Sequence, residues 1–493
     1  MNLSPDIIKL VFGLKVNQYR HGKNLSFAEL SKKSGLSASY LNEIEKGKKY
    51  PKTDKIMQLA DALEVTYDEL VSLKLGNQLG SVSDLITSNF LSEVPFDFFG
   101  IDPKSLLEML VNAPAKVSAF IRTVVGIGRN YNLSVEQFYF AVLRSYQELH
   151  QNAFPDLEKA AENFFDEYRI DESVTLDEFF LTNLLADKFG ISIDFYSDKE
   201  HPNLSSIRSI FQREKNTLML NSKTSSRQRA FTILREIGFL YLNLKERPIT
   251  SSWVEVNSFD EVLNNFKASY FAGSVLIPRK VLKEEMNHFF SQSTWQPELV
   301  NQMLDKFAVT PETLLHRMSN ILNEQFGISD FYFFRFEATR GKKDFRLTKE
   351  MHMSDRKDIY ANQSEHYCRR WLAFKTIDDV DFQLEKNTYL EPIVGVQRSI
   401  YHSTGRNFLL ITMSRPLNIQ SDKIESVSVG FEINDTLKSK ISFHNDPVIS
   451  NRVVNHTCER CEIFDCQERV AAPILLQKER HLKDMKAAIA ELG

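Results

Sequence analysis

The sequence predicts a multidomain protein of the α and α+β class. The chain has 493 residues, more than one hydrophobic core usually serves, so it should divide into several domains. Its N-terminal part carries apolar residues at helical spacing, and later parts combine short strand-like runs with helices. We expect a five-helix domain at 1–75, a helical linker at 76–187, an α+β domain at 188–325 and a second α+β domain at 326–493.

The composition indicates an ordinary globular protein and limits its partners. Hydrophobic residues make up 42% of the chain and charged residues 26%, and the net charge is -4. This charge gives no reason to expect wholesale affinity for nucleic acid or membranes, so any such binding must come from a local patch. No apolar run approaches the roughly 18 residues that span a bilayer, and the N-terminus lacks a signal-peptide pattern. We expect a cytoplasmic protein with no membrane partner.

The first domain is the most easily interpreted. Ser26 and Glu29 have the spacing of a capping box, and Gly35 interrupts the helical pattern that follows. Ser37 is suited to cap a short second helix, which Gly47 would end. Two short helices joined by a glycine turn are the helix-turn-helix arrangement.

This segment resembles the Cro/repressor-type helix-turn-helix family, and the run L-S-x-S-Y-L-N-E-I-E-x-G-K is specific to that family. The resemblance implies that the second helix of the pair enters the major groove of double-stranded operator DNA, while flanking lysines meet phosphates. The expected base or backbone contacts are Ser37, Ser39, Tyr40 and Asn42. The expected phosphate contacts are Lys32, Lys33, Lys46 and Lys48. The alternative is a small helical domain that contacts other proteins.

The linker is predicted to begin with turn-rich sequence and to become helical from about residue 105. Its helices are rich in aromatic residues, as in 135-VEQFYFAVLRSYQELH-150. These side chains are expected to pack in the core or between two copies of the chain. We therefore expect a spacer that also forms a homodimer.

The third part combines strands with a helix that carries an incomplete zinc motif. Strands are expected at 191–197, 206–212 and 217–222, followed by a helix at 226–242. Zinc peptidases carry H-E-x-x-H on such a helix, because histidines at i and i+4 share one face and the Glu polarises the metal-bound water. Glu236 holds the position of that Glu.

This part, with its closing A-x-x-F-A-x-x-x-L-x-P signature, resembles the IrrE/ImmA-type metallopeptidase domain. The family's three metal positions hold Arg235, Phe239 and Lys267 here. No tetrahedral zinc site remains without suitable ligands, so we expect no peptide hydrolysis. The altered cleft would suit an anionic ligand with a hydrophobic portion, held by Arg235, Phe239, Lys267 and Phe271. The alternative is that these substitutions seal a decayed active site.

The last part carries three cysteines in a tight group. Cys458, Cys461 and Cys466 have the spacing C-x₂-C-x₄-C, which lets thiolates converge from one loop, and the fourth cysteine of the chain is Cys368. In a reducing compartment this grouping indicates a metal centre. Zinc would take the loop cysteines with His456 or Cys368, whereas an iron–sulfur cluster would need all four thiolates. Buried thiols that merely pack are the remaining alternative.

Taken together, these parts resemble the short-chain fatty acyl transcriptional regulators, the family that includes the propionate (methylcitrate cycle) regulator. The resemblance includes C-x-x-W and C-x₂-C-x₄-C-x₂-R-x₃-P. It implies a bacterial, dimeric DNA-binding transcription regulator whose effector is a short-chain acyl-CoA. In some members of the family it also implies a [4Fe-4S] cluster. The family's cysteine positions hold Cys368, Cys458, Cys461 and Cys466, whereas Arg370 departs from the apolar or small residue usual there.

Two other functions fit parts of the sequence. An active IrrE/ImmA-type metallopeptidase acting on a partner repressor would need metal ligands near Glu236, and the sequence offers none there. A purely structural DNA-binding partner would have lost its sensing function. The expected function is therefore that of a regulator that is not an enzyme.

Overall fold

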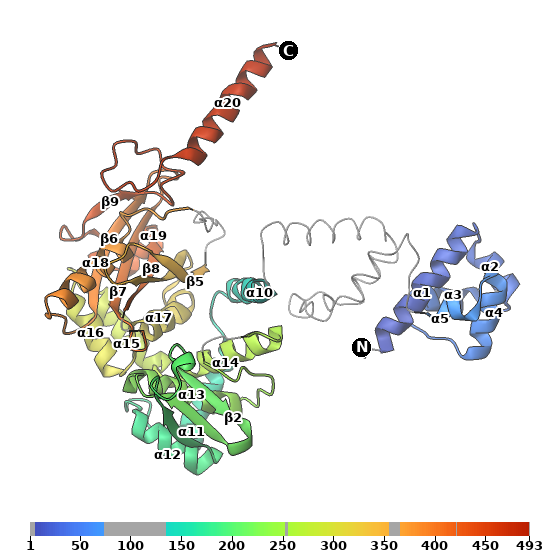
Figure 1. The fold of residues 1–493 in the computed structure, drawn as a ribbon, viewed down its shortest axis with the longest axis horizontal. Helices are drawn as coiled ribbons and strands as arrows, with labels where there is room; N and C mark the ends of the chain where they lie inside the picture. Colours follow the sequence, from blue (N-terminus) through green and yellow to red (C-terminus); the bar gives the residue numbers. More distant parts are fainter. Residues whose placement is uncertain (1–4, 73–134, 252–254, 354–364, 421, 493) are drawn as a thin grey trace. The chain divides into compact units, whose positions relative to one another are not determined.

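The structure is a computed structural model that describes residues 5–72, 135–251, 255–353, 365–420 and 422–492 (Figure 1). The chain divides into two compact units, Met1–Val142 and Leu143–Gly493, which are described separately below. Residues 73–134, which include positions 76–134 of the predicted linker, lie outside the described residues. Among the described helices, none is both long and apolar enough to cross a membrane.

The first unit contains the predicted five-helix domain. Its helices are α1 (Pro5–Gly22), α2 (Phe27–Ser34), α3 (Ala38–Glu45), α4 (Thr53–Leu63) and α5 (Tyr67–Val71). Their shared core is built from apolar side chains at helical spacing, among them Val16, Leu30, Leu41, Ile44, Leu59 and Leu63, which are fully buried.

Local chemistry sets the ends of α2 and α3. The Ser26 hydroxyl accepts a hydrogen bond from the Glu29 N–H at 3.2 Å, and the Ser26 N–H donates to the Glu29 carboxylate at 2.7 Å. Gly35 ends α2 with a φ of 70°, a conformation that glycine adopts without steric strain. The Ser37 hydroxyl caps α3 by accepting from the Tyr40 N–H at 3.2 Å. The predicted capping box, glycine turn and N-cap are confirmed.

Two features hold α3 close against α1. Gly13 lies so near that an added Cβ would overlap the carbonyl oxygens of Ile44 and Glu45. Arg20 on α1 donates from Nε to Glu45 Oε1 at 2.6 Å and from Nη2 to Oε2 at 2.9 Å. Both partners of this ion pair are buried. The sequence did not predict this pair, because its partners lie 25 residues apart.

The second unit begins with helices and a small sheet. These elements are α10 (Val135–Leu149, which crosses the boundary between the units), α11 (Pro155–Tyr168), α12 (Glu178–Phe189), β1 (Ser192–Tyr196), β2 (Ser209–Gln212) and β3 (Thr217–Asn221). The sheet order is β1-β3-β2, with β1 parallel and β2 antiparallel to β3. All three strands were predicted, with ends that differ by a few residues. Aromatic rings pack at the start of this unit, where the Phe154 ring lies 5.0 Å from Tyr146 and 5.1 Å from Phe266.

Five helices follow the small sheet. They are α13 (Ser226–Tyr241), α14 (Phe259–Leu276), α15 (Arg279–Phe290), α16 (Pro297–Lys306) and α17 (Pro311–Phe326). The predicted helix 226–242 corresponds to α13. Gly238 on α13 allows close packing on α14, since an added Cβ would lie 3.1 Å from the Ala268 carbonyl oxygen and 3.0 Å from the Phe271 ring.

A six-stranded sheet forms the rest of the unit. Its elements are β4 (Phe331–Thr339), β5 (Arg346–His352), α18 (Leu372–Glu385), β6 (Ile393–Tyr401), β7 (Asn407–Pro416), β8 (Lys423–Glu432), α19 (Asp435–Lys440), β9 (Asn451–Val454) and α20 (Ile474–Leu492). The strand order is β5-β4-β8-β7-β6-β9, and every pairing except β6 with β9 is antiparallel. β4 and β5 are consecutive in the chain and form an antiparallel pair at one edge of this sheet.

Side chains alternate across this sheet, as expected for strands covered on both faces. Phe331 and Phe333 join the core shared with α17, whereas Tyr332, Phe334 and Phe336 join the core under α18. In Figure 1, α20 extends away from the sheet at the C-terminal end.

Candidate functional site

The recognition helix α3 exposes part of the predicted DNA-contacting set. Ser37 and Ser39 are exposed and Asn42 is half-buried, so their polar groups can reach a ligand. Tyr40 is half-buried against the core, with the Lys55 ammonium 4.5 Å from its ring centroid. The predicted phosphate contacts Lys32, Lys33, Lys46 and Lys48 are all exposed. Lys33 lies 3.9 Å from the Glu64 carboxylate, a weak pairing that phosphate could replace.

The α13 helix carries the residues that replace the zinc-binding motif of a zinc peptidase. Arg235 and Glu236 are both buried, and Glu236 forms an ion pair with Arg247. Burial lowers the pKa of Arg235 to about 10, so its guanidinium stays protonated at neutral pH. Burial is also the main cause that raises the pKa of Glu236, and Arg247 opposes that rise. This buried position therefore holds two guanidinium groups and one carboxyl group.

Such a centre cannot activate water as a zinc peptidase does. Glu236 is engaged by a guanidinium, and a general base needs a metal-bound water to deprotonate. Within the described residues, no group of three or more His, Cys, Asp or Glu side chains is arranged to hold a metal ion.

Two of the four residues predicted to bind a ligand are apolar side chains buried in the protein core. Phe271 is fully buried and stacks on Tyr241 with ring centroids 5.4 Å apart, and Phe239 is 2% exposed. Lys267 is half-buried on α14. The role assigned to this set from the sequence stays a prediction.

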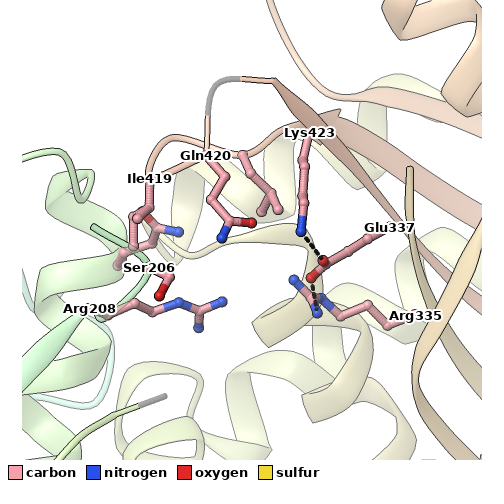
Figure 2. A pocket seen from close by; sticks show the side chains of 9 residues that line it. Ser206, Arg208, Arg335, Glu337, Ile419, Gln420 and Lys423 are labelled. Carbon is pink, nitrogen blue, oxygen red and sulfur yellow. Dashed lines mark ion pairs between the residues drawn. The ribbon is translucent and has the colours of Figure 1, made fainter. Parts of the chain in front are cut away.

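A cavity of about 260 Å³ lies instead between the small-sheet region and the six-stranded sheet (Figure 2). Its polar lining includes Arg208 before β2, Gln228 on α13, Arg335 on β4 and Lys423 on β8. The sequence does not predict this cavity, because its lining residues come from distant segments and no local motif marks them.

The cysteine loop is built by pairing of distant backbone segments. Tyr367 forms a β-bridge with Thr457. The Cys368 N–H donates to the His456 carbonyl at 3.1 Å, and the Cys458 N–H donates to the His366 carbonyl at 2.9 Å. This pairing brings Cys368 close enough to Cys458 and Cys461 for their charges to interact.

Arg469 organises the same loop. Its guanidinium donates to the carbonyls of Cys458 at 2.8 Å, Cys461 at 3.1 Å and Ile463 at 2.8 Å. Cys466 is half-buried, and its carbonyl accepts from the Arg469 N–H at 3.3 Å. The motif C-x₂-R contained this arginine, but its role as the centre of the loop could not be deduced from spacing.

The cysteine side chains do not form a closed metal site in this arrangement. Burial raises the pKa of the Cys368 thiol to about 11, so without a nearby cation it carries its proton at neutral pH. The backbone framework places Cys368 near Cys458 and Cys461, so a closed four-thiolate site would require these side chains and that of Cys466 to turn toward one another.

Comparisons with known proteins agree with the geometry of the first unit. Residues 16–70 match the helix-turn-helix family. The HTH-type transcriptional regulator y4dJ of Sinorhizobium fredii is 37% identical over 67 residues, which cover 14% of this chain and 86% of that protein. The chain therefore belongs to the helix-turn-helix family of DNA-binding transcriptional regulators.

Similarity extends into the second unit. Residues 186–319 match the IrrE N-terminal-like domain, which confirms the predicted peptidase-like fold. The HTH-type transcriptional regulator RamB of Mycobacterium tuberculosis is 21% identical over 492 residues, covering 94% of each chain. The propionyl-CoA carboxylase regulator of Cereibacter sphaeroides is 20% identical over 348 residues, covering 67% of this chain and 69% of that protein.

A solved structure also shares the fold. The Mycobacterium tuberculosis transcriptional regulator aligns with a TM-score of 0.50 and 19% identity. The alignment covers 67% of this chain and 93% of that one.

Proposed function

We propose that this chain is a bacterial transcription regulator whose DNA binding responds to a short-chain acyl-CoA. The proposal is carried by a complete helix-turn-helix joined to a chain that is similar, over nearly its whole length, to a transcriptional regulator. A second relative is named as a regulator of propionyl-CoA carboxylase, which supports the acyl-CoA class of effector. An effector that binds one conformation of the second unit more tightly shifts the population toward that conformation. In a dimer, this changes how two recognition helices meet successive major grooves.

DNA binding with and without acyl-CoA is the direct test. Purified full-length protein is footprinted on its own promoter and on promoters of acyl-metabolism genes, with acetyl-CoA and propionyl-CoA added in turn. We expect protected half-sites about one helical turn apart, or a multiple of that distance, and an affinity that changes with one of the acyl-CoAs. Protection that appears nowhere, or that ignores both compounds, would contradict the proposal.

Alanine substitutions at two exposed lysines distinguish a direct phosphate contact from a general effect of positive charge. Lys46→Ala should weaken binding to all DNA sequences and reduce the salt slope by about one, because one phosphate contact is lost. Lys245→Ala is the matched control, since Lys245 is also exposed but lies outside the helix-turn-helix unit. Equal effects of the two changes would argue against contact through α3.

We also propose that the regulator is a homodimer, and α20 supports contact between two copies. From Gln477 onward its described side chains are all exposed. Leu482 and Ile489 recur at heptad spacing with Met485 between them, and they are 54%, 65% and 48% exposed, respectively. An isolated helix with such an apolar stripe is stabilised when a second helix covers the stripe.

The oligomeric state tests this contact. Leu482→Glu combined with Ile489→Glu should convert a dimer to a monomer in sedimentation, because charges replace the apolar stripe. Lys483→Glu, on the same helix but off the stripe, should leave the dimer intact. A dimer that survives the double change would locate the contact elsewhere, for example in the predicted spacer.

The proposed regulator does not act as a peptidase, because Glu236 is paired with Arg247 and the zinc-ligand positions hold Arg235, Phe239 and Lys267. We further propose that Cys368, Cys458, Cys461 and Cys466 hold a [4Fe-4S] cluster, with zinc as the alternative. A cluster would supply a redox-sensitive element beside the six-stranded sheet. Anaerobically purified protein should then be brown and contain iron and acid-labile sulfide, whereas colourless protein with stoichiometric zinc would contradict the cluster.

A further inference from the structure

The cavity between the small-sheet region and the six-stranded sheet has an unusual polar lining. Figure 2 shows Arg208 and Gln420 directed into the cavity from one side and Arg335, Glu337 and Lys423 from the other. Its volume of about 260 Å³ is below the roughly 300–1,000 Å³ of pockets that enclose a drug-sized ligand. The cavity therefore has room for a charged group of a ligand.

Most of the charge in the wall of the cavity is already paired. Arg335 donates to Glu425 at 2.9 Å and lies 2.8 Å from Glu337. Glu425 also accepts from Arg415 at 2.6 Å. The rigid part of the site is thus a network on the sheet side, which holds Arg335 in a fixed orientation.

Two cations that face the cavity are not neutralised in this way. The Arg208 carbonyl oxygen accepts from the Asn221 N–H at 2.9 Å, but its guanidinium forms no hydrogen bond or ion pair within the part of the chain that the structure describes. Among the described residues, the Lys423 ammonium forms an ion pair with Glu337 alone, at 3.8 Å. Arg208 is nevertheless near enough to lower the pKa of the Glu312 and Glu425 carboxyls, so it belongs to the same electrostatic cluster.

The cluster carries an excess of positive charge. Among the residues that the structure describes, its cations are Arg208, Arg335, Arg415, Lys349 and Lys423. Its carboxylates within the same described residues are Glu312, Glu337 and Glu425. His316 adds no charge, because burial lowers its pKa to about 3. Five cations face three carboxylates, which leaves two positive charges to be balanced.

Neutral donors complete the site. The side-chain oxygen Oε1 of Gln228 accepts from the Ser225 N–H at 3.0 Å. The side-chain N–H groups of Gln228 are therefore left available as donors. Gln420 directs its amide toward the cavity (Figure 2). A phosphate group, with a charge near minus two and several acceptor oxygens, matches two excess cations and these donors better than a carboxylate does.

We propose that this cavity binds a phosphate group of a ligand, with Arg208 and Lys423 as its principal partners. The ligand would be a phosphate-bearing effector or free phosphate. Where the effector is taken to be an acyl-CoA, the inference rests on the proposed function. Because the walls belong to the small-sheet region and to the six-stranded sheet, a bound phosphate would tie these two regions together.

Thermal unfolding and calorimetric titration of the full-length protein test the site. The probes are inorganic phosphate, acetyl-CoA and acetyl-pantetheine, which lacks phosphate, all at constant ionic strength with chloride as the reference. Phosphate and acetyl-CoA should both raise the unfolding temperature, and acetyl-pantetheine should not. Protection by phosphate alone would identify free phosphate as the ligand, and protection by neither phosphate nor acetyl-CoA would overturn the proposal.

Three variants make the test residue-specific. Arg208→Ala and Lys423→Ala should each weaken phosphate binding about tenfold or more, the loss expected for one charge-assisted hydrogen-bond partner. Arg213→Ala is the control, because Arg213 is exposed in the turn just after β2 and does not line the cavity. Equal phosphate affinity in Arg208→Ala and Arg213→Ala would overturn the proposal. If Arg208→Ala does not fold, Arg208→Lys and Lys423→Ala carry the same comparison.

The two proposals fail in different ways. If acetyl-CoA alters DNA binding but Arg208→Ala and Lys423→Ala leave phosphate affinity unchanged, the phosphate site is wrong and the regulatory function stands. If both variants lose phosphate binding but no acyl-CoA alters DNA binding, the phosphate site stands and the acyl-CoA response is wrong.

Discussion

Glu45→Ala tests how the recognition helix is held in place. Glu45 is the last residue of α3 and is 2% exposed. Its carboxylate accepts from Arg20 at 2.6 and 2.9 Å and from Asn17 at 2.7 Å. Arg20 is 6% exposed, and its Nη1 donates to the Leu25 carbonyl at 2.9 Å. Removing the Glu45 carboxylate therefore leaves a buried guanidinium without its counter-charge.

The expected loss of stability is large for a domain of this size. Removing one partner of a buried ion pair costs about 3–5 kcal/mol, whereas a whole domain is typically stable by about 5–15 kcal/mol. The matched control is Glu43→Ala, on the same helix. The Glu43 pair with Lys49, at 2.8 Å, has side chains that are 39% and 54% exposed. An exposed pair contributes only about 0.2–1 kcal/mol.

Calorimetry of the full-length protein, together with operator binding, measures the difference. Glu45→Ala should lower the unfolding transition of the first unit far more than Glu43→Ala, and DNA binding should fall with the fraction of that unit that is folded. Replacing both partners with apolar residues, Arg20→Met with Glu45→Leu, should restore much of the stability, because no buried charge then remains. Indistinguishable transitions in Glu45→Ala and Glu43→Ala would refute the anchoring role of the pair.

Three further changes are expected to have distinct outcomes. Gly13→Ala should destabilise the first unit by about 1–3 kcal/mol through overlap with the α3 backbone, as measured by its unfolding temperature. Glu236→Gln should leave peptide hydrolysis by the purified protein unchanged while lowering its unfolding temperature, because buried Arg247 loses its counter-charge; a loss of hydrolysis would indicate a catalytic Glu236. Cys368→Ser should abolish visible absorbance and iron content if four thiolates hold a cluster, whereas metal retained in this variant would favour zinc completed by His456.

Local chemistry made the first unit predictable. The capping box of Ser26 and Glu29, the φ of Gly35 and the cap at Ser37 each depend on residues within a few positions of one another. Their spacing therefore appears directly in the sequence. The ion pair of Arg20 with Glu45 could not be predicted in the same way, because it requires the packing of α1 on α3 to be known.

The cysteine site also combines features that the sequence predicts with features that only the fold shows. The spacing of Cys458, Cys461 and Cys466 is local and indicated a loop that gathers thiols. The approach of Cys368 depends on the bridge between Tyr367 and Thr457, which no spacing encodes. The sequence thus supplied the loop residues by their spacing and Cys368 by the cysteine count, whereas the approach of Cys368 to the loop appears only in the fold.

The altered zinc motif and the cavity show which properties of a site cannot be predicted from residue types alone. The sequence established that Arg235 and Phe239 cannot bind zinc, since this follows from side-chain chemistry alone. Whether the two residues line an open cleft depends on burial, and both are buried. Arg208, by contrast, has a guanidinium without an ion pair among the described residues, and the carboxylates that it influences on β8 and α17 lie more than a hundred residues further along the chain. A cation is available for a ligand only when the carboxylates near it are paired with other cations. The sequence does not show which carboxylate pairs with which cation, because these pairs form between distant segments of the folded chain.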